Sequence, residues 1–264
     1  MSVLYSNFAP DFKNERAKNM KTDKDLRFLS SCENEDLRVL CDILTHDRFG
    51  NIRITEQLTS TDEYNRSYPE DMLFLVPQIS EELLKFGSNT ITTFWNGKPD
   101  TYATVLRRIC KQMDVKTKEH DDVKTMEQNL LTELCQDALN KMSERELRLL
   151  ANENGIPDKR LTRQALTATL LMAIRTSRPI LTRIVARIIQ YIVEFVTVRG
   201  VATAGIERAT RAVGGALGPI GWAALGAWTV YDISSPAYRV CIPAVLQVAY
   251  MRLSRFQNEE RKVA

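Results

Sequence analysis

The residues most often used in metal sites and catalysis are sparse in this sequence. Its two histidines, His46 and His120, have no Cys, Asp or Glu at the spacing that a zinc site requires. Asp47 begins a segment that resembles a calcium loop, but Phe49 and Leu58 stand at the third and twelfth positions, where oxygen ligands are needed. A turn between helices explains this segment better. We therefore predict no metal site and no bound cofactor.

Other catalytic patterns are missing too. The sequence has no G-x-x-x-x-G-K-[ST] phosphate loop and no G-x-S-x-G nucleophile turn. The adjacent carboxylates Glu81–Glu82 and Asp121–Asp122 could act as a general acid and base, but such pairs on a helix or turn normally face water. We therefore expect a protein that is not an enzyme, without catalytic residues.

The five cysteines form no C-x-x-C pair and mostly stand among apolar residues, which is typical of buried free thiols in a reducing compartment. We interpret them as core residues: Cys32, Cys41, Cys110, Cys135 and Cys241. Residues Met1 to Lys13 lack the basic and apolar stretches of a secretory signal. The predicted location is therefore cytoplasmic.

The elements that position these residues are predicted to be helices. Three capping boxes, Ser30-x-x-Glu33, Ser67-x-x-Glu70 and Ser143-x-x-Glu146, each precede an apolar run, and Gly87 and Gly155 supply helix ends. The segment from Met126 to Met142 repeats apolar residues every fourth position, which predicts a core helix whose stripe is formed by Leu130, Leu134, Ala138 and Met142. Strand signals are limited to two short pieces, 51–55 and 90–94, which fit loops or helix ends equally well. The predicted fold class is all-α.

The charge distribution divides the chain. Residues 161–264 carry 13 Lys and Arg against 5 Asp and Glu, whereas residues 1–160 carry 23 against 28. A helix stop, a set of turn residues and the reversal of charge coincide at residues 152–161. This segment is therefore the best candidate for a domain boundary. We predict four parts, namely an N-terminal extension (1–22), an acidic helical domain (23–156), a basic apolar helical region with a Gly-rich hairpin (157–257) and a polar tail (258–264).

The basic region contains a long uncharged stretch. Residues 212–231 carry no charge over twenty positions, about the length of a helix that spans a bilayer. Pro219 near its centre and several glycines favour two shorter helices that meet at a turn formed by Gly218, Pro219 and Gly221. We favour a buried soluble hairpin and keep insertion into lipid as the alternative. A last helix is expected from Pro236 to about Phe256.

The basic region also contains the candidate contact residues. Arginines on an apolar helix suit anionic lipid headgroups, and they equally suit salt bridges to the acidic half of the same chain. Tryptophans beside apolar sequence suit an interface or a core. The candidates for contact with a partner or membrane are Arg183, Arg187, Trp222, Trp228, Tyr238 and Arg239. Nucleic acid is disfavoured, because the arginines are diluted among aliphatic residues and stand apart from the tryptophans.

Several blocks of sequence resemble a known family. The most specific are G-P-I-G-W (218–222) and S-P-A-Y-R-V-C-I-P-A-V-L-Q (235–247), joined by L-R-F-L (26–29) and L-T-H-D (44–47). Together they are similar to the YaaW-like family of functionally uncharacterised bacterial proteins, which is grouped with the ubiquinol-cytochrome c chaperone domain. The resemblance spans about 23–252 and implies an α-helical fold, with no catalytic residues to transfer.

The sequence therefore predicts a non-enzymatic helical binding protein. Its Arg-rich apolar C-terminal region would associate with an anionic membrane surface or a protein partner. The alternatives are a pore-type effector that inserts residues 178–250 into lipid, and a chaperone or assembly factor that holds a client helix. The predicted location is cytoplasmic, with peripheral or integral attachment to the inner membrane as the alternative. The sequence is also compatible with a homo-oligomer.

Overall fold

The computed structural model describes residues 22–47, 50–88, 100–156, 162–176, 179–186 and 238–263. Within these ranges the secondary structure is helical, and no strand is formed. The one extended pairing among them is an isolated antiparallel bridge between His46 and Ile52. The all-α prediction is therefore confirmed, and the strand signal at 51–55 belongs to a turn after a helix. The second strand signal, at 90–94, lies outside the described residues.

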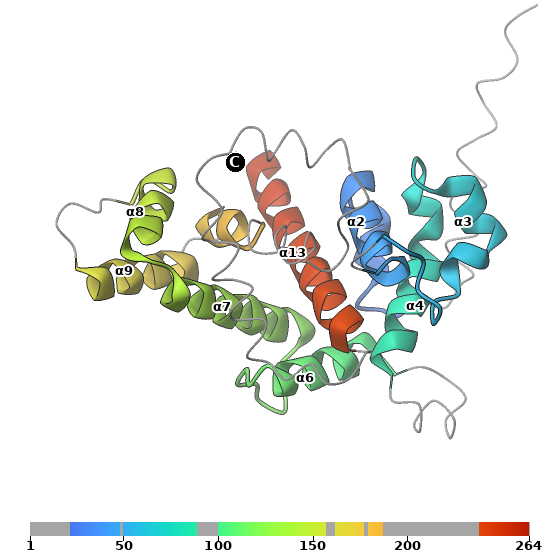
Figure 1. Ribbon diagram of the computed structural model, residues 1–264, viewed down its shortest axis with the longest axis horizontal. Helices are drawn as coiled ribbons and strands as arrows, with labels where there is room; N and C mark the ends of the chain where they lie inside the picture. The colour runs from blue at the N-terminus through green and yellow to red at the C-terminus, as the bar shows by residue number, and fades with distance from the viewer. Residues whose placement is uncertain are drawn as a thin grey trace, which may run out of the picture.

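The described part of the chain folds into a series of helices (Figure 1). Short 3-10 helices, η1, η2 and η3, are interspersed among longer α-helices. In chain order the elements are η1 (Arg27–Ser31), α2 (Asn34–Thr45), η2 (Leu58–Ser60), α3 (Asp62–Ser67), η3 (Met72–Leu75), α4 (Val76–Gly87), α6 (Tyr102–Gln112), α7 (Val123–Lys141), α8 (Glu144–Glu153), α9 (Arg163–Thr176) and α13 (Tyr238–Val263). Residues 179–186 are also helical.

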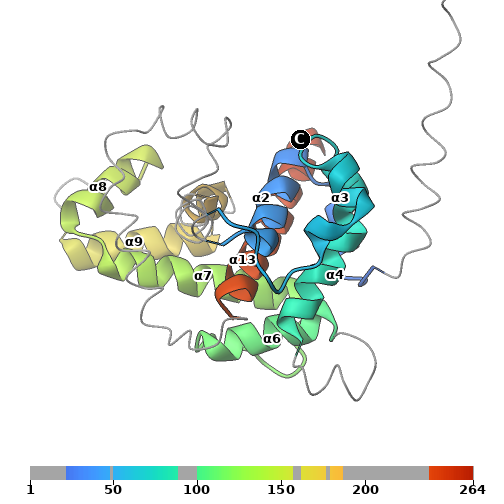
Figure 2. The ribbon, with the colours of Figure 1, turned by 45° about the vertical axis from the view of Figure 1, so that its right-hand side comes forward.

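The last helix, α13, lies in the middle of the bundle rather than at its edge. It packs against α2, α4, α6 and α7, so elements from both ends of the sequence share one core (Figures 1 and 2). Nearly every residue from Val240 to Ala249 is buried. Pro243 is accommodated inside the helix, and α13 continues to Val263 where the pattern predicted an end near Phe256. The C-terminal helix is therefore a central support of the fold.

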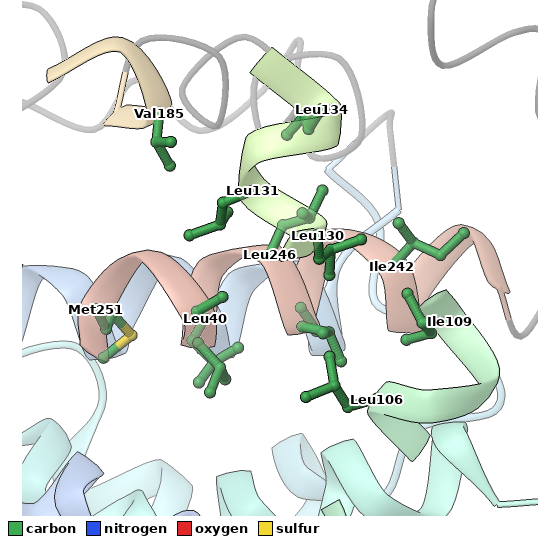
Figure 3. Packing of buried hydrophobic residues seen from close by; sticks show 14 of the residues in the cluster. Leu40, Leu106, Ile109, Leu130, Leu131, Leu134, Val185, Ile242, Leu246 and Met251 are labelled. Carbon is green, nitrogen blue, oxygen red and sulfur yellow. The ribbon is translucent and has the colours of Figure 1, made fainter. Parts of the chain in front are cut away.

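The apolar stripe of α7 is confirmed. Leu130, Leu134, Ala138 and Met142 are all buried, with Met142 at the C-cap of the helix. Figure 3 shows Leu130 and Leu134 in the cluster that includes Leu246 of α13. The spacing of four residues keeps these side chains on one face of the helix, so that one stripe can be removed from water.

One of the three predicted capping boxes forms. The Ser143 hydroxyl accepts from the Glu146 amide, and the Glu146 carboxylate accepts from the Ser143 amide, at the start of α8. The Ser30 box is wrong, because the Ser30 hydroxyl donates to the Arg27 carbonyl within η1, and α2 begins only at Asn34. The Ser67 box is wrong because Ser67 ends α3. In both cases the predicted cap belongs to a short helix that precedes the next long helix.

The helix ends at glycine are confirmed. Gly87 is the last residue of α4, where an added Cβ would overlap the Val105 side chain, so the absence of a side chain lets α6 approach closely. Gly155 follows α8 with φ of +69°, a backbone conformation that favours glycine. These two positions fix where α4 and α8 stop.

One hydrophobic cluster runs from Leu26 to Met251 and includes Leu150 and Leu166, which lie on either side of the proposed boundary at 152–161. Four of the five cysteines are buried in it and Cys32 is half-buried; all five are free thiols, as the sequence predicted. Burial raises the pKa of the Cys110 thiol to about 11 and that of Cys241 to about 12, which suppresses their thiolate forms at neutral pH.

Candidate interaction site

Three of the sequence-predicted contact residues lie at the two flanks of the Arg/Gly-rich segment, which we define as residues 187–237. Arg183 is exposed on the short helix 179–186, Tyr238 is half-buried against the core at the start of α13, and Arg239 is exposed beside it. The remaining candidates lie outside the described residues: Arg187, Trp222, Trp228 and the turn residues Gly218, Pro219 and Gly221. The structure thus describes the attachment points of the segment.

Both attachment points are packed into the same core. On one side Leu181, Ile184 and Val185 are buried, and on the other side Val240 and Ile242 are buried. Figure 3 shows Val185 in the same cluster as Leu131 of α7 and Leu246 of α13. Burying an aliphatic side chain contributes roughly 1.5 to 3 kcal/mol, so each flank is held firmly. The segment therefore starts and finishes on one folded body.

The flank that leads into the segment carries positive charge without negative partners. Residues 162–186 contain no Asp or Glu. Arg175 and Arg183 are exposed; Arg175 donates to the neutral Gln136 side chain at 3.3 Å, and neither arginine forms an ion pair with a described residue. Met172, on the same helix as Arg175, is 66% exposed. This combination of exposed arginines and exposed apolar surface is typical of interfaces with anionic surfaces.

Other arginines of the basic region are used inside the protein. Arg252 Nε lies 2.6 Å from Glu127 Oε2, and both side chains are almost fully buried. The other carboxylate oxygen of Glu127 accepts from the Tyr102 hydroxyl at 2.8 Å. Burial raises the pKa of Glu127, while the guanidinium of Arg252 and both hydrogen bonds oppose that shift. The ion pair therefore joins α13 to α7 and α6 in the interior.

The same arginine reaches the N-terminal part of the chain. Its Nη2 donates to the Asp25 carbonyl at 2.5 Å, and the guanidinium lies 3.9 Å from the centre of the Phe28 ring, a cation–π contact. Arg255 donates to the Phe28 carbonyl at 3.4 Å, and Arg163 of α9 donates to the carbonyls of Asn140 and Met142. Part of the charge asymmetry is thus neutralised within the chain, which is one of the alternatives left open by the sequence.

The acidic pairs behave differently from each other. Asp122 accepts from the Thr125 amide and caps α7, and Asp121 accepts from the Lys118 amide. Glu81 is exposed, but Glu82 is buried and accepts from the Gln57 amide at 3.2 Å. The expectation that both pairs face water is therefore wrong for Glu82. Its role is to hold the connection between α2 and η2 onto α4.

Perturbed carboxyls occur on α2. Burial, reinforced by the nearby carboxylates of Glu33 and Glu35, raises the pKa of Asp36 to about 6. Burial also raises the pKa of Asp42, whose carboxylate accepts from the Tyr68 hydroxyl at 3.0 Å. Each contact of Asp42 is explained by packing of α2 against the chain after α3. In the described part of the chain no group of three or more His, Cys, Asp or Glu side chains could hold a metal ion.

Sequence reasoning did not find the Arg252–Glu127 pair. The two residues are 125 positions apart, and each stands in a helix whose local pattern explains it as an ordinary surface charge. Among the helices of the described ranges, none is both long and apolar enough to cross a membrane; residues 212–231 lie outside those ranges.

The fold and the buried polar contacts together define an all-α protein organised around its C-terminal helix. Residues 20–54 match a domain of unknown function, DUF3944, which comprises η1, α2 and the turn that follows. A UPF0174 protein of Helicobacter pylori strain J99 is 33% identical over 244 residues, which cover 92% of this chain and 96% of the relative. The chain therefore belongs to the UPF0174 family.

A more distant relative fits the same conclusion. The UPF0174 protein YaaW of Escherichia coli K12 is 27% identical over 236 residues, covering 89% of this chain and 95% of the relative. The resemblance to a YaaW-like family is thereby confirmed. No solved structure matches the chain.

Proposed function

We propose that this chain is a non-enzymatic binding protein that associates with an anionic membrane surface through its Arg-rich apolar C-terminal region. The observation that supports the proposal most is the attachment of the segment 187–237. Its two flanks are packed into one core, and the flank that leads into it carries Arg175 and Arg183 without an ionic partner among the described residues.

The physical reason is the match between this region and a lipid headgroup layer. Arginine side chains can lie along apolar surface and extend their guanidinium groups to phosphates. Each basic residue near an anionic bilayer contributes about 1 kcal/mol. The uncharged stretch 212–231 supplies apolar residues, with Trp222 and Trp228 suited to the interface. On this proposal the folded body acts as an anchor that keeps the segment attached at both ends.

The location that follows is the cytoplasmic face of the inner membrane, with the protein bound peripherally. Binding of a protein partner by the same region is the competing outcome. Catalysis has no part in the proposal. The carboxylates of Glu82, Asp42 and Glu127 already hold contacts that pack α2, α4, α7 and α13.

The experiment is flotation of the full-length protein with vesicles of phosphatidylcholine that contain or lack phosphatidylglycerol. We expect binding that requires phosphatidylglycerol and weakens with salt. The double variant Trp222→Asp with Trp228→Asp should weaken binding about tenfold, because it removes apolar contact and adds negative charge. The double variant Arg183→Gln with Arg187→Gln should weaken it by a similar factor.

Matched controls separate these effects from general changes of charge or hydrophobicity. Ile54, which is fully exposed and outside the region, is changed to Asp as the apolar control. Arg66→Gln with Arg145→Gln is the charge control on exposed helical positions. The proposal is contradicted if the protein does not bind vesicles that contain phosphatidylglycerol. It is also contradicted if the control variants lose as much vesicle binding as the test variants. Release of vesicle contents would indicate insertion instead, and retention of a protein on pull-down would indicate a protein partner.

A further inference from the structure

A hollow of about 510 Å³ is lined by residues of α6 and of the chain that directly follows it. Figure 1 shows where α6 lies in the fold. It is bounded by α6 and by the connection from α6 to α7. We propose that this hollow binds a phosphate-bearing ligand. The proposal stands on residues of the acidic half of the chain and does not rest on membrane association.

The wall formed by α6 is basic because of its residue spacing. Thr104, Arg107, Arg108 and Lys111 stand three, four and seven positions apart, so they share one face of the helix. The opposite face, which includes Val105, Leu106, Ile109 and Cys110, is buried against α7, α4 and α13. The helix is thus fixed by its apolar face, and its cationic face is directed outward.

The second wall is formed by a sharp turn at the end of α6. Asp114 has φ of +54°, the Asp114 amide donates to the Lys111 carbonyl, and the Val115 amide donates to the Cys110 carbonyl at 2.8 Å. This is the Schellman arrangement of a helix end, and buried Val115 secures it. The turn reverses the chain so that Lys116 and Thr117 line the hollow beside α6.

Two of the four cations are held in place by the protein. Arg107 donates to the carbonyls of Lys118 and Asp121 at 2.9 and 3.4 Å, which joins the turn to α6. Arg108 donates to the Gly87 carbonyl at 3.1 Å and to Asp100 at 2.7 Å. Positioned guanidinium groups lose little side-chain entropy when they bind an oxyanion, which favours binding.

The other two cations, Lys111 and Lys116, are exposed and have no partner among the described residues. The hollow is also lined by one carboxylate, that of Asp114, and Asp100 neutralises Arg108. The excess of two positive charges matches a phosphate dianion. Arginine, lysine and threonine together supply the donors that phosphate oxygens accept. The volume is that of a site for a small molecule rather than for a single ion.

The test is calorimetric titration of the full chain with inorganic pyrophosphate at fixed ionic strength. We expect saturable binding that weakens about tenfold in Lys111→Gln with Lys116→Gln, because both substituted side chains are exposed cations of the hollow. Asp114→Asn should tighten binding about threefold, because it removes the one repulsive charge and Asn tolerates positive φ. Arg66→Gln with Arg145→Gln, the same change of net charge elsewhere, should leave the affinity unchanged.

A parallel flotation with phosphatidylglycerol vesicles identifies the source of the phosphate. Dependence of pyrophosphate binding on Lys111 and Lys116 indicates a soluble phosphate compound. If vesicle binding depends on these lysines and pyrophosphate binding does not, the ligand is a lipid headgroup. The proposal is overturned if neither binding depends on the two lysines, or if the charge control loses affinity equally. Because the pyrophosphate titration contains no lipid, failure of membrane association leaves the pyrophosphate result intact.

Discussion

Arg252 and Arg183 belong to the same basic part of the sequence but have opposite environments. Arg252 is buried between α13, α7 and η1, where Glu127, a carbonyl and an aromatic ring surround its guanidinium. Arg183 is exposed on helix 179–186 and has no ionic partner among the described residues. A regional excess of charge therefore contains two populations, one that stabilises the fold and one that stays available to a partner. Substitutions that distinguish the two populations test this view.

The largest expected effect is that of Arg252→Met. Removing one member of a buried ion pair leaves an uncompensated charge, which costs about 3 to 5 kcal/mol. Adding Glu127→Gln should recover much of that loss, because the amide is neutral and its oxygen can still accept from the Tyr102 hydroxyl. Urea unfolding followed by circular dichroism measures both. Arg183→Met should change the unfolding free energy by less than about 0.5 kcal/mol; equal losses in the two single variants would refute the distinction.

The next effect concerns Asp36, a partly buried carboxyl in the first turn of α2. The pKa of Asp36 is raised from its ordinary value of 3.8 to about 6, so the folded protein binds a proton that the unfolded chain releases. Stability from this group is therefore greatest at low pH and is lost as the pH rises from about 4 to about 6. At pH 7.5, Asp36→Asn should stabilise the protein by about 1 to 2 kcal/mol, allowing for partial exposure.

The pH profile of that variant is the decisive measurement. The gain should disappear below about pH 3, where Asp36 is protonated in both the folded and the unfolded state. Glu119→Gln, an exposed carboxylate in the α6–α7 connection, is the control and should shift stability little at any pH. If Asp36→Asn raises the free energy of unfolding by the same amount at every pH, the effect comes from packing rather than from ionisation of Asp36.

The smallest expected effect is that of removing a helix cap, and it is compared between the box at Ser143, which forms, and the predicted box at Ser30, which does not. Ser143→Ala removes the side-chain acceptor at the start of α8 and should cost about 1 kcal/mol. Ser30→Ala should cost less than about 0.5 kcal/mol, because the Ser30 hydroxyl only donates to a carbonyl within η1. Thermal unfolding of both variants is a sufficient test, and a larger loss at Ser30 would restore the predicted box there.

Features that depend on neighbouring residues were predicted from the sequence more successfully than features that depend on contacts between elements. Local patterns predicted the helical class, the ends of α4 and α8, and the buried stripe of α7, because these features depend on residues within one or two turns of each other. The capping boxes at Ser30 and Ser67 were wrong, since Ser30 lies inside the 3-10 helix η1 and Ser67 is the last residue of α3. The basic hollow was missed because its two walls meet only through the turn at Asp114.

The sequence by itself determined the class of fold, the family resemblance and the concentration of arginine in the C-terminal part. Only the tertiary structure decided which arginines are neutralised inside and which face outward, and it placed α13 at the centre of the bundle. The physical reason is that an ion pair such as Arg252–Glu127 joins residues 125 positions apart. Its stability depends on the burial that the packed helices create, and no local pattern in the sequence records that burial.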